Sequence, residues 1–114
     1  MAWAVEFSEE AENDFALILD HLFGSYVDFG ETREEGFERA ARRVMEIRKA
    51  GEDIAKAPHR GTIRDDIVPG LRNVTVDRAI FWFDLDDDRR IVRILGVFFG
   101  GQDHVRHMLV RLLG

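Results

Sequence analysis

The chain of 114 residues contains no cysteine, only two prolines and a single tyrosine. Without cysteine it has no disulfide scaffold, no thiol nucleophile and no thiolate metal site. Its longest uncharged apolar stretch, residues 94–99, is far shorter than the roughly 20 residues that span a membrane. The first residues lack a basic region followed by a long apolar one, so we expect no signal peptide. These absences predict a cytosolic protein with no membrane partner.

The composition that remains is typical of one folded domain over residues 1–114. Hydrophobic residues make up 46% of the chain and charged residues 33%, which excludes wholesale disorder. A chain of this length can bury one core but has no room for two domains.

The net charge of −6 is distributed unevenly. Residues 1–39 hold eleven acidic and two basic side chains, whereas residues 40–114 hold eleven acidic and fourteen basic ones. An acidic first third argues against wrapping by nucleic acid, and we expect no direct sequence-specific nucleic-acid binding. Two interpretations of the second half stay open: a local basic surface, or solvated faces of amphipathic elements.

A strand and a first helix are predicted at the start of the chain. Alternation of large apolar residues indicates a strand at Trp3–Phe7, and Ser8 then has the position of a helix N-cap. Gly24 and Gly30 mark the exit from this helix. Its apolar stripe consists of Ala11, Phe15, Ile18, Leu19 and Leu22.

A second helix follows at once. Thr32 and Glu35 have the spacing of a capping box, in which each side chain satisfies a free backbone N–H. The apolar stripe then continues until Pro58, which cannot extend a helix. Two long helices joined by a short loop form an antiparallel hairpin.

The residue pattern of the second half of the chain predicts strands followed by a short helix. Segment 59–70 is a loop or a weak edge strand. Strands are predicted at Leu71–Asp77, Arg78–Leu85 and Arg90–Phe99, with a turn at Asp86–Asp88, and a terminal helix at Val105–Leu113. Three consecutive strands form an antiparallel meander. The order predicts an α+β domain of two layers, with helices on one side of a mostly antiparallel sheet.

Several segments, in this order, resemble the RelE/ParE superfamily of toxins from bacterial type II toxin–antitoxin systems, and its ParE branch most. They are VEFS at 5–8 with Ala11 and Asp14, PHRG at 58–61, RDDIVPGLR at 64–72, IVRILGVFF at 91–99 and GGQD at 100–103. The resemblance implies a cytosolic toxin of a plasmid-stabilisation system that a cognate antitoxin neutralises. ParE-like members poison DNA gyrase, whereas RelE-like members cleave messenger RNA on the ribosome.

An enzyme of the RelE type needs a base, an acid and one or two cations around the scissile phosphate. The resemblance offers His104, because some nuclease members have a histidine at about this place. Asp103 beside it could orient the ring, and Arg64 and Arg72 could supply the cations, although the resemblance favours a structural role for the segment 70–72. The chain departs from that pattern, because a glycine stands where a RelE-type arginine would align and the one tyrosine, Tyr26, lies near the end of the first helix. The alternative is that His104 and His107 form the exposed face of the terminal helix.

Metal sites are weakly indicated. His104 and His107 share a helix face, but no third strong ligand has suitable spacing. Four aspartates at 84–88 lack the glycine and glutamate of a calcium loop and fit a polar turn better. We expect no metal and no cofactor.

Arginines and aromatics supply the remaining candidates. Arg64 and Arg72 flank Asp65 and Asp66. The arginines could bind a carboxylate or phosphate, or they could pair with the aspartates within the loop. Alternation places Phe81 and Phe83 on one face of the sheet and Trp82 on the other, where either an antitoxin segment or the terminal helix would cover it. The candidate contacts with target or antitoxin are Arg64, Arg72, Trp82, Phe99, Gln102, Asp103, His104 and Arg106.

The interpretation that the sequence favours is a non-enzymatic gyrase inhibitor. An acidic isoelectric point of about 5.2 fits a polyanionic ribosome poorly. The alternatives are a metal-independent, ribosome-dependent endoribonuclease and an inactive homologue that serves only as a binding partner. The sequence leaves open whether the chain is a monomer or a homodimer.

Overall fold

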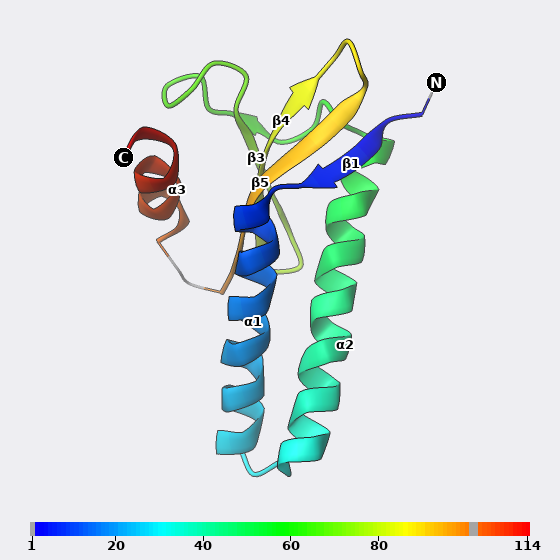
Figure 1. Cartoon of the computed structure of the whole chain (residues 1–114), viewed down its shortest axis with the longest axis vertical. Coiled ribbons are helices and arrows are strands. Elements are labelled where there is room, and N and C mark those ends of the chain that lie inside the picture. The colour runs from blue at the N-terminus through cyan, green and yellow to red at the C-terminus, as the bar shows by residue number, and fades with distance from the viewer. Residues whose placement is uncertain (1, 101–102) are drawn as a thin grey trace.

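The computed structural model describes residues 2–100 and 103–114 as a sheet with a long helical hairpin and a short terminal helix (Figure 1). In chain order the elements are β1 Ala4–Phe7, α1 Glu9–Asp28, α2 Arg33–Glu52, the 3₁₀ helix η1 Asp53–Lys56, β2 Thr62–Ile63, β3 Arg72–Val76, β4 Ala79–Asp86, β5 Ile91–Phe99 and α3 His104–Leu113. The predicted α+β class and element order are confirmed.

The helical hairpin begins at the predicted caps. The Ser8 hydroxyl accepts from the Ala11 amide at 3.0 Å, and the Thr32 hydroxyl accepts from the Glu35 amide at 3.1 Å. The Glu35 carboxylate accepts from the Thr32 hydroxyl instead of a backbone N–H. Helix α1 continues past Gly24 to Asp28, and α2 with η1 stays helical until two residues before Pro58. Figure 1 shows the two helices antiparallel and reaching far beyond the sheet.

The sheet has the strand order β1-β5-β4-β3-β2. Strands β3, β4 and β5 form the predicted antiparallel meander, and β2 is a two-residue edge strand within the segment predicted as loop or weak edge. Strand β1 pairs with β5 in parallel, from Ala4 opposite Ile91 to Phe7 opposite Ile94. The remainder of β5 therefore has no strand on that side and runs beside α1.

Apolar side chains are buried on both faces of the sheet. One core lies between the sheet and the helices α1 and α2, and contains Phe81 and Phe83. The other contains Trp82, Phe98 and Met108 and is covered by α3. The predicted separation of Trp82 from its two neighbours is confirmed, and the terminal helix is what covers it. We predicted from the sequence that all helices lie on one side of the sheet. This is wrong for α3, which packs on the face opposite the hairpin.

The two long helices carry too many charged side chains to serve as membrane spans. Across the described residues, no helix combines the length and apolar character needed to cross a bilayer.

Candidate functional site

The elements α1, β5 and α3 meet at an irregularity in β5. Trp82 of β4 lies opposite Gly96 and Phe83 lies opposite Ile94, so Leu95 is an extra residue that bulges from the ladder. At the bulge, the Val97 amide bonds to a side chain of α1 and the Leu95 carbonyl to a side chain of α3. Gly96 leaves room for this arrangement, because a Cβ there would lie 2.7 Å from the Met108 sulfur.

A buried ion pair joins the three elements. Asp14 of α1 is 4% exposed and accepts from the Val97 amide at 2.9 Å. Arg111 of α3 donates to both Asp14 oxygens, at 2.8 and 3.0 Å, and to the Leu95 carbonyl at 3.1 Å. The hydrogen bonds to Asp14 raise the pKa of Arg111. The pair thus occupies the edge of β5 that β1 leaves uncovered.

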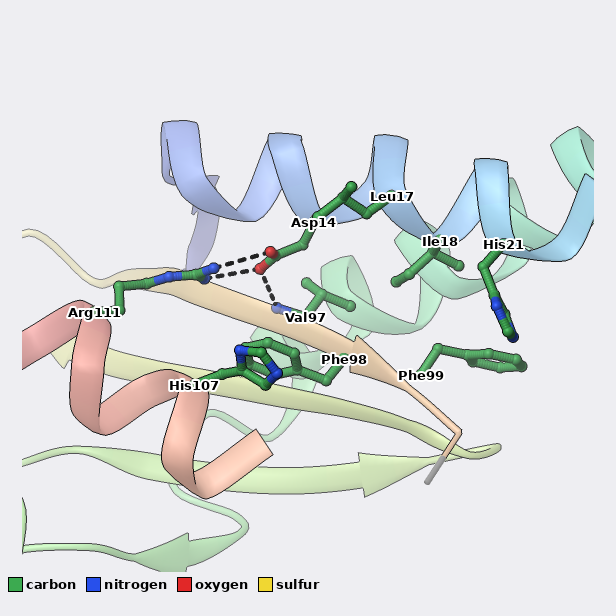
Figure 2. Close-up of a pocket in the computed structure, with 9 residues that line it drawn as sticks. All are labelled: Asp14, Leu17, Ile18, His21, Val97, Phe98, Phe99, His107 and Arg111. Atoms are coloured by element: carbon green, nitrogen blue, oxygen red, sulfur yellow. Dashed lines mark hydrogen bonds and ion pairs between the residues drawn. The ribbon is translucent and has the colours of Figure 1, made fainter. Parts of the chain in front are cut away.

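Beside this ion pair lies a pocket of about 110 Å³ (Figure 2). Figure 2 shows Asp14 and Arg111 at one end and His21 with Phe99 at the other. His107 stacks on Phe98 with ring centroids 5.6 Å apart. The pocket is lined by Asp14, Leu17, Ile18, His21, Val97, Phe98, Phe99, His107 and Arg111. Of these, only Phe99 is among the contact candidates from the sequence, since the pocket depends on how α3 packs against α1.

His104 is fixed to the sheet by a hydrogen bond. The indole N–H of Trp82 donates to His104 Nδ1 at 3.1 Å, so the neutral imidazole carries its proton on Nε2. Burial lowers the pKa of His104, the Arg64 charge lowers it further, and Asp103 opposes both. His104 is half-buried while His107 is exposed. The prediction that both form the exposed face of the helix holds for His107 alone.

Asp103 serves as the N-cap of α3. Its carboxylate accepts from the Arg106 amide at 3.2 Å. The Arg106 side chain is exposed on α3. Gln102 lies outside the described residues.

Arg64 is held within its own loop. Its guanidinium pairs with Asp66 through two hydrogen bonds of 2.9 Å and lies 5.6 Å from the centroid of the Trp82 ring. This pairing raises the pKa of Arg64 and lowers the pKa of Asp66. Asp65 accepts from the Gly70 amide at 2.8 Å. Of the two sequence interpretations, the arrangement corresponds to pairing within the loop.

Arg72 lies on the other face of the sheet. It is the cross-strand partner of Phe83, whose side chain belongs to the core beneath the hairpin. The Arg72 guanidinium donates to the His59 carbonyl at 2.8 Å. The structure therefore brings Arg64, Trp82 and His104 together on the α3 face and separates Arg72 from them.

Phe99 ends β5 on the hairpin face of the sheet. The guanidiniums of Arg43 and Arg78 lie over its ring, 5.4 and 5.5 Å from the centroid. Among residues 2–100 and 103–114, no three histidine, aspartate or glutamate side chains gather as metal ligands would.

Comparison with known proteins finds relatives at the level of structure. No protein-family model matches the chain, and no curated protein matches its sequence. A chain of the chromosomal ParDE toxin–antitoxin system from P. aeruginosa superposes with a TM-score of 0.63 at 22% identity, over 86% of this chain and 96% of that one.

Two RelE-type structures match with a slightly lower TM-score and a lower identity. A mutant of the E. coli toxin RelE in the free state gives a TM-score of 0.59 at 14% identity and covers 100% of both chains. A chain of the RelBE2 toxin–antitoxin complex from Mycobacterium tuberculosis gives 0.59 at 14% identity, over 88% of this chain and 100% of that one. The chain therefore has the fold of the RelE and ParE toxins, as its sequence segments imply.

Proposed function

We propose that the chain is the toxin component of a type II toxin–antitoxin system, and that it inhibits DNA gyrase. A cognate antitoxin encoded with it would neutralise it. The fold shared with chains of ParDE and RelBE complexes and the sequence segments of the ParE type support the first part. Because a fold alone does not define activity, the choice of gyrase depends on the candidate site.

The observation that carries the choice is that the four residues suggested for RNA cleavage do not form a complete site, although Arg64 and His104 lie on the same face of the sheet. Asp103 caps α3, Arg64 is paired with Asp66, and Arg72 binds a backbone carbonyl on the opposite face of the sheet. A phosphoryl-transfer site needs its base, acid and cation within reach of one phosphate. A surface that binds a protein target has no such requirement.

A supercoiling assay tests this proposal. Purified protein is titrated into DNA gyrase with relaxed plasmid and ATP, and lost supercoiling and trapped cleaved DNA are scored. We expect inhibition by the intact chain. Full gyrase activity in the presence of excess folded protein would refute the proposal for that gyrase.

Two charge reversals locate the inhibiting surface. Arg106→Glu changes an exposed contact candidate on α3, and we expect it to weaken inhibition about tenfold. Arg89→Glu makes the same change in charge at the turn between β4 and β5, where 65% of the side chain is exposed. Equal loss from both variants would indicate a general effect of charge and not a contact at α3.

One observation favours the second candidate, a ribosome-dependent endoribonuclease. Arg64 and His104 lie together on the α3 face, and because His104 Nδ1 accepts from Trp82, its Nε2–H is left to donate to a phosphate oxygen. His104→Asn separates the two candidates, because an asparagine oxygen can still accept from Trp82 while the titrating group is gone. A nuclease would cleave ribosome-bound mRNA as the intact chain and lose this activity with the change, whereas a gyrase inhibitor would leave the mRNA intact in both forms.

A further inference from the structure

Four arginines gather on the hairpin face of the molecule, and we refer to them as the arginine cluster. Arg39, Arg42 and Arg43 come from α2 and line a shallow depression with Tyr26 and Glu46. Arg78 comes from the turn between β3 and β4. Arg43 connects the two parts, because its Nη2 donates to the carbonyl of Asp77 in that turn at 2.9 Å. None of its four arginines belongs to α3 or lines the pocket beside it.

The cluster holds more positive charge than its neighbours neutralise. Glu31 pairs with Arg39 at 2.6 Å and Glu46 pairs with Arg43 at 3.2 Å. No carboxylate among the described residues pairs with Arg42 or with Arg78. Two cations of the cluster, one on each side of Arg43, are therefore left without a paired carboxylate on a chain whose net charge is −6.

Aromatic rings hold the guanidiniums in place. Arg43 and Arg78 both lie over the Phe99 ring, and Arg39 lies 4.2 Å from the centroid of Tyr26. Stacking limits the freedom of these long side chains. A pre-organised guanidinium loses less entropy when it binds an anion.

The backbone of Arg78 gives an independent indication. Asp77 and Arg78 have φ of 48° and 71° and form the two-residue turn between β3 and β4. Such turns favour glycine at the second position, because a left-handed backbone conformation crowds any Cβ. An arginine is thus placed where the turn itself disfavours it, at the point where its guanidinium completes the cluster.

We propose that the arginine cluster binds an acidic segment of a partner protein. Guanidiniums form paired hydrogen bonds with carboxylates, and an extended acidic segment can place successive carboxylates over α2 and the turn. Nucleic acid fits less well. Guanidiniums already lie over the rings of Tyr26 and Phe99, so a base that stacked there would have to displace them. A duplex also carries one negative charge about every 1.7 Å, so the net charge of −6 repels it more strongly than a short peptide with a few carboxylates.

A pair of turn variants tests the proposal. The probe is a short fluorescein-labelled peptide of repeated Glu-Glu-Leu, and its binding is followed by fluorescence anisotropy. Arg78→Gly removes one guanidinium while relieving the backbone, so we expect affinity to fall about tenfold with an unchanged or higher Tm. Asp77→Gly relieves the same turn but removes an acid, and we expect its affinity to be equal or higher. Equal affinity of Arg78→Gly and the intact chain would overturn the proposal.

A charge reversal provides a second test of the proposal. Arg42→Glu is expected to weaken peptide binding about tenfold, whereas Arg89→Glu at the opposite end of β4 has little effect. The same titrations with a labelled DNA duplex identify the ligand class: tighter binding of the duplex, lost with Arg42→Glu, would show a nucleic-acid site and refute an acidic protein segment. The readout is peptide binding, so the inference stands or falls independently of gyrase inhibition.

Discussion

At the scale of single residues, Gly96 shows how closely α3 packs against β5. A Cβ at this position would lie 2.7 Å from the sulfur of Met108, 3.0 Å from Arg111 Nη1 and 3.1 Å from a ring carbon of Phe98. Met108 is fully buried, so it cannot simply swing into solvent. Any side chain at residue 96 must therefore displace Met108 within the filled core between α3 and the sheet.

We therefore predict that Gly96→Ala lowers the free energy of unfolding by about 1–3 kcal/mol, the usual cost of overpacking a filled core. Gly24→Ala is the matched control. Gly24 lies inside α1 with no atom within 4 Å of its Cβ position, so alanine should stabilise the chain by about 0.5–1 kcal/mol. Urea unfolding of both variants measures the difference. A Gly96→Ala protein as stable as the Gly24→Ala protein would show that α3 is not held as described.

At the scale of elements, the Asp14–Arg111 pair links α1 to α3 across the bulge in β5. Removing one partner leaves the other charge buried without its counterion, which costs about 3–5 kcal/mol for a fully buried pair. Because 24% of the Arg111 side chain is exposed, hydration by water offsets part of this cost. We predict that Arg111→Met lowers the free energy of unfolding by about 2–4 kcal/mol.

A double-mutant cycle with Asp14→Asn isolates the pair itself. Because Asp14 also accepts from the Val97 amide, its replacement has a cost of its own that the cycle subtracts. We expect a coupling energy of about 1–3 kcal/mol between the two positions, measured by urea unfolding. Additive effects of the two substitutions would mean that the ion pair contributes nothing beyond its separate contacts.

The elements themselves were predictable because their signals are local. Ser8 and Thr32 cap the helices that follow them, and the two-residue alternation separates Trp82 from Phe81 and Phe83. These signals depend on neighbours in the sequence. The fold class follows from the order of such elements, and the chain shares its fold with the RelE and ParE toxins that its segments resemble.

The candidate site was less predictable because it depends on distant pairings. Asp14 and Arg111 are 97 residues apart, and they meet only because Leu95 bulges from β5. Arg64 and Arg72 are close in sequence, yet the sheet separates their side chains. Neither the bulge nor the face that α3 covers leaves a local pattern in the sequence.

At the scale of the whole molecule, α3 is the cover of one of two cores. Trp82 is fully buried, and Leu71 and Phe98 are 1% and 5% exposed on the face that α3 occupies. Helix α3 carries exposed apolar residues of its own, with Val110 65% and Leu113 64% exposed. None of the buried residues of the hairpin core belongs to α3.

We predict that deleting residues 103–114 leaves the helical hairpin formed but exposes the second core. The fluorescence of Trp82 should shift to the red, measured in a Trp3→Phe background because the chain has two tryptophans. Binding of the dye ANS should rise while the far-ultraviolet circular dichroism keeps the signal of α1 and α2, because the hairpin core is buried separately. The intact chain in the same background is the control. Complete loss of helical signal on deletion would show that the two cores fold as one cooperative unit.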